Sequence, residues 1–390
     1  TMTGAWALAI RERPGLGLRL AIDRINLDAY LPKSRRNQAA PKTNSGVAKA
    51  KPGAGENPPA SGANGLALLD TFDANFDASV GRLTVQGATL RKLHAEGLLV
   101  GGDVNFSTLR VADAGGVAAT LRGDVRGLGG TPAIALDFDV TGKDLSQTFR
   151  WLGVKPPLTP KQLGKVTAKG RLDGGLKALS FKASIIAAGS KIALNGALKD
   201  IAGAPKIAIG ARIDHPDLTK AVRLFAPTFK PAASNLGAVA AAFRMTGNAT
   251  GLDITEIDAA LGPVTVAGAM SVGLGGPQPR IKATLETGEV LTDLFLPSRK
   301  PADTARNRQR KANGLSSSAA TAGGSGGGAA NPRWSREKID LSGLKGVDAD
   351  VTLTMAGLIV DRIQLDKPHV VFKLKGGRLN VEKFNAGVLG

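Results

Sequence analysis

Apolar and polar residues alternate along most segments of this chain of 390 residues. The clearest runs of this kind are 134–141, 177–185, 191–199, 206–214 and 350–355. Successive side chains of a strand point to opposite faces of a sheet, so a period of two predicts strands with one apolar face. Gly-rich turns, such as Asp173-Gly174-Gly175 and Gly376-Gly377, follow at the short spacing of antiparallel meanders. We therefore expect a mainly β protein.

A long-range repeat adds a second constraint. The segment 72–115 aligns without gaps on 347–390, and both copies are 44 residues long. The order of strands and turns agrees throughout, although identities are few; examples are Asp73 with Asp348 and Val85 with Val360. Each copy follows a short phrase ending in Leu-Pro and then a basic segment. Repetition of this kind indicates a chain assembled from similar units.

Short helices are expected at a regular spacing. Asp217 is a good N-cap for a helix over 218–225, and Asp144 is expected to cap a similar helix that ends near 152. Further helices are expected at 27–31 and 289–296, each ended by a proline. Leu145, Leu218 and Val290 lie 73 and 72 residues apart, which predicts a unit of about 72 residues with several antiparallel strands and one closing helix.

Two segments differ in composition from the rest. Residues 33–64 hold six Lys/Arg and one Glu, and residues 299–338 hold nine Lys/Arg and two acidic residues, so they carry 12 of the 19 net positive charges. Both are rich in Gly, Ala, Ser, Pro or Asn, which predicts disordered linkers. The expected segments are 1–32, the end of a preceding unit; 33–64, a linker; 65–158, 159–231 and 232–297, β-units with closing helices; 298–336, a linker; and 337–390, a C-terminal module cut short.

No catalytic motif is present in the sequence. There is no Cys and no phosphate-binding loop of the G-x-x-x-x-G-K-[ST] type, and the pattern G-x-S-x-G occurs only within the Gly-rich linker tract at 323–328. The three histidines, His94, His215 and His369, stand in separate modules, so a metal site is not expected. Residues 159–163 are expected to form a capped turn between two units. We expect a protein that is not an enzyme, has no cofactor and binds no nucleic acid, since its aromatic residues are scattered.

The phrases INLDAYLP (25–32) and GEVLTDLFLP (288–297), and the segment 347–390, resemble the AsmA family of bacterial envelope proteins. The resemblance implies a β-rich body in the periplasm, anchored to the inner membrane by a helix outside this sequence, together with a role in outer-membrane biogenesis. In the wider group, which includes TamB-like and chorein-type proteins, repeated sheets curl into a groove that is thought to carry phospholipid. The resemblance also admits outer-membrane assembly components as partners. The chain begins and ends in strand pattern, and we expect an internal fragment of a longer protein.

The residues expected to line the groove, or else to fill a closed core, are the apolar members of the alternating strands. They are Leu136, Phe138, Leu179, Phe181, Ile185, Ile192, Leu194, Ile207, Ile209, Ile213, Val351 and Leu353. Two arrangements stay open: an elongated open groove that holds lipid, or two sheets that cover each other as in a sandwich. The alternative function is that of a structural or adhesive β-repeat protein, which would have closed cores and recognise a glycan or protein at its surface.

Overall fold

The computed structural model describes residues 1–29, 67–85, 87–153, 156, 158–296 and 346–389. Strands account for 67% of these residues and helices for 9%, which confirms a mainly β protein of antiparallel meanders with short helices. The two basic linkers, 33–64 and 298–336, lie entirely outside the described residues. The described residues divide into two units, one of 1–214 with 244–248 and one of 215–243 with 249–390, and each is considered by itself.

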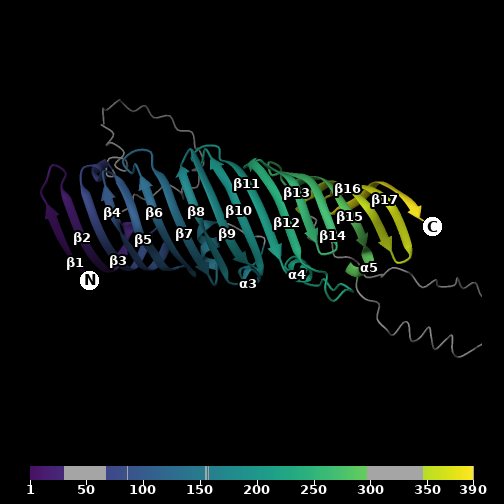
Figure 1. Cartoon of the computed structure of the whole chain (residues 1–390), viewed down its shortest axis with the longest axis horizontal. Helices are drawn as coiled ribbons and strands as arrows, with labels where there is room; N and C mark the ends of the chain where they lie inside the picture. Colours follow the sequence, from purple (N-terminus) through teal and green to yellow (C-terminus); the bar gives the residue numbers. More distant parts are fainter. Residues whose placement is uncertain (30–66, 86, 154–155, 157, 297–345, 390) are drawn as a thin grey trace, which may run out of the picture. The chain divides into compact units, whose positions relative to one another are not determined.

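The first unit is a sheet in which neighbours in sequence are neighbours in space (Figure 1). Its strands are β1 (Met2–Ala9), β2 (Gly15–Asn26), β3 (Asp73–Val85), β4 (Ala88–Val100), β5 (Asp103–Ala114), β6 (Val117–Arg126), β7 (Ala133–Gly142), β8 (Val166–Gly175), β9 (Ala178–Ala187), β10 (Ser190–Lys199) and β11 (Lys206–His215). Its helical segments are η1 (Leu27–Ala29), η2 (Leu68–Asp70), α2 (Ser146–Leu152) and α3 (Pro160–Leu163). Every pair is antiparallel except β2–β3.

The second unit has the same construction. Its elements are α4 (Leu218–Arg223), β13 (Gly251–Leu261), β14 (Val264–Gly273), β15 (Arg280–Leu291), α5 (Thr292–Phe295), β16 (Asp348–Val360), β17 (Ile363–Lys375) and β18 (Arg378–Leu389). Strand β12 (Val239–Asn248) is divided between the two units. From β13 to β18 the strands again pair in sequence order, and β15–β16 is the parallel pair. A parallel pair needs a long connection, and in both units that connection contains a basic linker.

The long-range repeat is confirmed in detail. Strands β3, β4 and β5 and strands β16, β17 and β18 have the same bounds after a shift of 275 residues. Lys92 and Lys367, which are equivalent under this shift, both have positive φ, 50° and 42°. A backbone N–H bond from Gly101 to Asp73 Oδ1 at 3.2 Å corresponds to one from Gly376 to Asp348 Oδ1 at 3.1 Å. The two copies therefore share turns and irregularities of the backbone, which are set by local geometry.

The 72-residue unit is also visible in the order of elements. Four strands, β8 to β11, precede α4, and four strands, β12 to β15, precede α5. Strands β8 and β12 begin at Val166 and Val239, which are 73 residues apart. The capped turn expected at 159–163 is α3, where Thr159 Oγ1 accepts the backbone N–H of Gln162 and the Gln162 side chain accepts the N–H of Thr159.

Two local predictions were wrong. Gly174 and Gly175 lie inside β8 rather than in a turn, because Gly174 fits an extended conformation at φ 125° that other residues avoid. The helix expected at 289–296 is shorter: β15 continues to Leu291, and only Thr292–Phe295 is helical. In this segment the parallel pairing of β15 with β16 outweighs the helical pattern. Helices α2 and α4 are likewise short, with seven and six residues.

Gly97 gives a direct test of sheet packing. A Cβ at this position would lie 2.2 Å from the carbonyl oxygen of Asn105 and 2.9 Å from the Phe76 ring. We expect Gly97→Ala to lower the free energy of unfolding by about 1–3 kcal/mol, because the crowded backbone must move. Gly130→Ala is the matched control, since nothing lies within 4 Å of a Cβ at Gly130. Equal thermal unfolding midpoints for the two variants would contradict this packing.

Candidate functional site

The ten candidate residues of the first unit share one face of the sheet. Cross-strand pairing arranges them in four rows that run across β7 to β11. The rows are Ile134–Gly174–Leu179–Leu198–Ile207; Leu136–Leu172–Phe181–Gly196–Ile209; Phe138–Gly170–Ala183–Leu194–Ala211; and Val140–Ala168–Ile185–Ile192–Ile213. The alternation of the sequence thus places Ile185, Leu194 and Ile209, which belong to different strands, on one surface.

The same four rows continue from β7 back to β1. Pairing through β6, β5, β4, β3 and β2 extends each row without interruption. In β1 the rows end at Leu8, Trp6, Gly4 and Met2. All 44 positions of the four rows across β1 to β11 are Gly, Ala, Val, Leu, Ile, Met, Phe or Trp. We call this surface the apolar face of the first unit.

Among the described residues of the first unit, no second sheet covers this face, and the strands form a single layer. All twelve candidate residues are half-buried, and none is fully buried. Among the described residues only fourteen apolar side chains are buried, and one of them is that of Pro368. The sequence left two arrangements open, and each unit has the open sheet. Among the described residues, neither unit contains a sandwich of two stacked sheets.

Aromatic rings lie over glycines on the apolar face. The space for a Cβ at Gly170 is taken by Phe138, whose Cζ lies 2.7 Å away, and the space at Gly196 by Phe181, at 3.1 Å. Gly97 is covered in the same way by Phe76, whose ring also packs edge-on against Phe106 at 6.0 Å between centroids. The rings occupy the space beside these glycines and fill the face without adding a polar atom.

The second unit has an equivalent face, which contains Val351 and Leu353. Val351 pairs with Ala283 and Phe372, and Leu353 pairs with Leu285 and Val370. Three rows cross β13 to β17 and a fourth crosses β13 to β16, where it ends at Met355; the only polar side chain in the four rows is that of Thr287. The twelve candidates thus belong to two faces of the same kind, one in each unit.

Short helices close one end of each apolar face. In the first unit, α2 packs on the turn between β5 and β6, where the Thr148 hydroxyl donates to the Gly115 carbonyl. In the second unit, the backbone N–H of Leu218 at the start of α4 donates to the carbonyl of Gly237. Val117 and Gly142 in the first unit and Val264 in the second are buried at this end. The strands' apolar surface is therefore covered where the helices lie and open elsewhere.

The predicted caps are confirmed for α4 and partly for α2. The Asp217 carboxylate accepts the backbone N–H of Lys220 at 3.0 Å, and this bond lowers the pKa of Asp217. A lowered folded-state pKa means that the cap stabilises α4 at neutral pH and is lost as the pH falls through that lowered value. Asp144 precedes the N-cap of α2, Leu145, and accepts from the hydroxyl and N–H of Ser146, which lower the pKa of Asp144.

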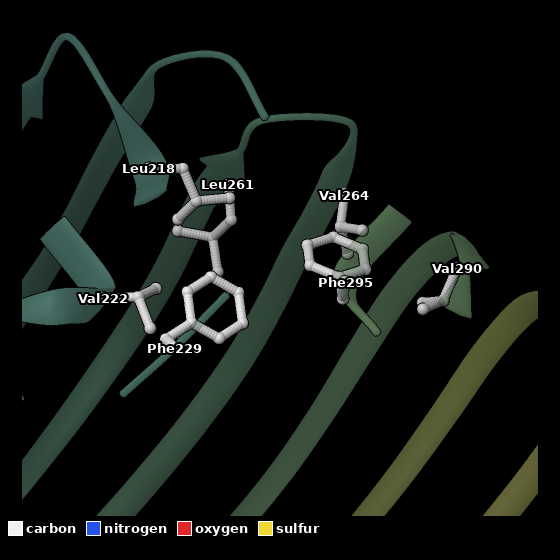
Figure 2. A pocket seen from close by; sticks show the side chains of 7 residues that line it. All are labelled: Leu218, Val222, Phe229, Leu261, Val264, Val290 and Phe295. Carbon is white, nitrogen blue, oxygen red and sulfur yellow. The ribbon is translucent and has the colours of Figure 1, made fainter. Parts of the chain in front are cut away.

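A pocket of about 270 Å³ lies at the helix end of the second face (Figure 2). It is lined by Leu218, Val222, Phe229, Leu261, Val264, Val290 and Phe295. Leu218 and Val222 come from α4, Leu261 from the end of β13, Val264 from the start of β14, and Phe295 from α5. This pocket was not predicted from the sequence. The amphipathic spacing of Leu218 and Val222 was a signal for it, but the segments that complete it are remote in sequence.

The opposite face carries charged side chains of both signs. Lys169 pairs with Asp139 at 2.9 Å and Arg171 with Asp137 at 3.1 Å, and all four side chains are about half exposed or more. Such pairs contribute little to stability. Because these side chains are exposed, this face is the solvated one.

The part of the chain that the structure describes contains no group of three metal-ligating side chains. In that same part, no helix has the length and apolar character needed to span a membrane.

Two of the three histidines occupy equivalent positions on the solvated side, a relation that the sequence analysis did not recognise. A hydrogen bond of 3.1 Å joins Ser79 Oγ and His94 Nδ1, and one of 3.2 Å joins Thr354 Oγ1 and His369 Nδ1. Each pair crosses the strand pair next to the positive-φ lysine. The pairs therefore belong to the repeated backbone geometry. His215 is buried, and its Nδ1 accepts the backbone N–H of Asp217.

Comparison of the chain with models of protein families, with curated proteins and with solved structures finds no match.

Thr219 in α4 gives a test of how tightly the helix end is packed. Its hydroxyl is buried, and it has no hydrogen-bond partner among the described residues. We expect Thr219→Val to raise the free energy of unfolding by up to about 1–3 kcal/mol, since an unsatisfied buried hydroxyl is replaced by a methyl group of similar shape. Val222→Thr, the reverse exchange one turn away, should destabilise the protein. Thermal unfolding measures both, and a less stable Thr219→Val variant would contradict the assignment.

Proposed function

We propose that this chain is part of an envelope protein of the AsmA type that carries phospholipid along its apolar sheet faces. In such a protein the sheets lie in the periplasm, a helix anchors the protein in the inner membrane, and the lipid moves in support of outer-membrane biogenesis. The resemblance of 25–32, 288–297 and 347–390 to that family supports the proposal. The observation that carries it is the unbroken apolar face of the first unit.

The dimensions of that face suit an acyl chain. Ten intervals of about 4.8 Å separate β1 from β11, and three intervals of about 6.7 Å separate the first row from the fourth, so the face measures roughly 50 Å by 20 Å. The hydrocarbon core of a bilayer is about 30 Å thick, so one acyl tail spans about 15 Å. A tail laid along the strands therefore fits within the four rows, and several can lie side by side.

The chemistry of the face favours lipid over a protein partner. An area of roughly 1,000 Å² exceeds the apolar patches of a few hundred Å² that soluble proteins usually expose. Protein interfaces of this size are only about 56–58% apolar and contain a hydrogen bond for every 100–200 Å². The side chains of the four rows offer no hydrogen-bond donor except the indole N–H of Trp6. Acyl chains need no hydrogen bonds, and a face with almost no polar group matches them.

Substitutions on the two sides of one strand test the proposal. Leu194 lies on the apolar face and its neighbour Ala193 on the solvated face, opposite Arg212. We expect delipidated wild-type protein to take up fluorescent phospholipid from vesicles and Leu194→Asp to take up at least about tenfold less, because a charge against acyl chains costs several kcal/mol. Ala193→Asp should retain uptake. Ile209→Asn, a milder change in the same face, should give an intermediate loss.

Circular dichroism and the unfolding midpoint must show that each variant is folded. Extraction of lipid from the purified wild-type protein, followed by mass spectrometry, provides the second measurement. Folded, delipidated wild-type protein that takes up no labelled phospholipid would overturn the proposal. Equal loss of uptake in Ala193→Asp and Leu194→Asp would also contradict it, because the apolar face would then have no special role.

A further inference from the structure

Helix α4 and the residues that follow it have two unlike sides. In 218–230, Leu218, Val222 and Phe229 line the apolar pocket. The same segment contains three basic residues, Lys220, Arg223 and Lys230, and no acidic residue. All three basic side chains belong to exposed residues. An apolar pocket is therefore bordered by a short cationic segment.

Two of these basic residues, Arg223 and Lys230, contact or directly follow Phe229, which lines the pocket. Arg223 Nε donates a hydrogen bond of 2.9 Å to the carbonyl oxygen of Phe229, so the guanidinium lies against the backbone of a pocket residue. Lys230 directly follows Phe229 in the chain. Lys220 is partly neutralised by Asp217, whose carboxylate lies 3.4 Å from its Nζ. Within the described residues, neither Arg223 nor Lys230 has a carboxylate partner at ion-pair distance.

Acidic groups near the pocket belong to other elements. Asp217 caps α4 and pairs with Lys220. Asp293 on α5 and Glu289 at the end of β15 are exposed, and they flank the side of the pocket formed by Val290 and Phe295. The charge is therefore unevenly distributed: positive on the α4 side of the pocket and negative on the α5 side.

We infer that this pocket binds one acyl tail of an anionic phospholipid, with the headgroup against Arg223 and Lys230. The inference rests on the proposed function and names the lipid class. An apolar cavity of about 150 Å³ is large enough to hold benzene, so a pocket of about 270 Å³ holds a longer hydrocarbon segment. A guanidinium pairs well with phosphate oxygens, and each basic residue near an anionic lipid surface adds attraction. A zwitterionic headgroup gains less from two cations, because its own positive group is repelled.

The test compares two lipids and two pairs of charge reversals. Delipidated protein is mixed with vesicles of phosphatidylcholine that contain a trace of tail-labelled phosphatidylglycerol or tail-labelled phosphatidylcholine, and the bound label is measured after the vesicles are removed. We expect wild-type protein to take up the anionic lipid roughly tenfold better. Arg223→Glu with Lys230→Glu should abolish that preference, and Arg223→Gln with Lys230→Gln should reduce it.

The control pair is Lys282→Glu with Lys375→Glu. Both residues are exposed in the same unit, and the pair changes the net charge by the same amount as the test pair. This control matters because a chain with a net charge of +19 attracts any anionic surface. The variant with Lys282→Glu and Lys375→Glu should keep the preference for the anionic lipid. Val222→Phe, which fills part of the pocket, should lower the uptake of both lipids at the second unit while the protein remains folded.

The outcomes separate the two proposals. Equal uptake of the two lipids by folded wild-type protein would overturn the inference and leave the proposed function standing. An equal loss of preference in the Lys282→Glu, Lys375→Glu variant would also overturn the inference, because the net charge of the protein would then explain the preference. Uptake of neither lipid would overturn the proposed function as well. A preference that survives in the Arg223→Glu, Lys230→Glu variant would place the headgroup elsewhere and reject this site.

Discussion

The strands described in each unit form a single-layered β-sheet with one apolar face and one charged face, and the rest of the structure depends on the apolar face that this sheet leaves without a second layer. The hydrogen bonds of the strands satisfy the backbone, so the sheet needs no second layer to form. It leaves the apolar side chains half-buried. Complete burial of a Leu, Ile, Val or Phe is worth about 1.5–3 kcal/mol, and a half-exposed side chain gains only part of it. Each unit is thus a folded sheet, and an apolar molecule that covers its apolar face would stabilise it further, because the half-exposed side chains would then be buried.

The repeat shows which residues such a sheet cannot exchange. Between 73–114 and 348–389, apolar positions vary freely: Phe76 corresponds to Val351, and Ala78 to Leu353. The positions that agree include the glycine turn, Gly101 with Gly376, and the positive-φ lysine, Lys92 with Lys367. Pairing between strands fixes the backbone, and any apolar side chain of suitable size serves on an open face. The two copies therefore differ in the side chains of the apolar face but agree in the turns. This is expected because the described sheet has no close-packed core that would fix the size of each apolar side chain.

The strands and the twelve face residues could be predicted from the sequence because alternation is a local property. Phe181 and Lys182 reveal their faces by position alone. The helix at 289–296 could not be placed correctly, because Leu291 remains in a strand through its parallel partner Ile359, 68 residues away. The pocket was missed for the same reason, since Leu218 and Phe295 meet only after two hairpins have formed. Contacts that depend on distant pairing leave no periodic signal.

The helix end of the second face differs from the rest of it in charge as well as in burial. Along the strands, charges lie on the solvated face, as Lys373 does with Glu382 at 2.9 Å, and that pairing raises the pKa of Lys373. The apolar rows carry no charge, so they cannot distinguish one lipid headgroup from another or fix the direction in which a lipid lies. A choice of headgroup must be made where cations border apolar surface, and among the pocket-lining elements α4 and the residues after it meet that condition through Arg223 and Lys230. A flat, uncharged face suits movement of a tail, and a pocket bordered by cations suits its retention.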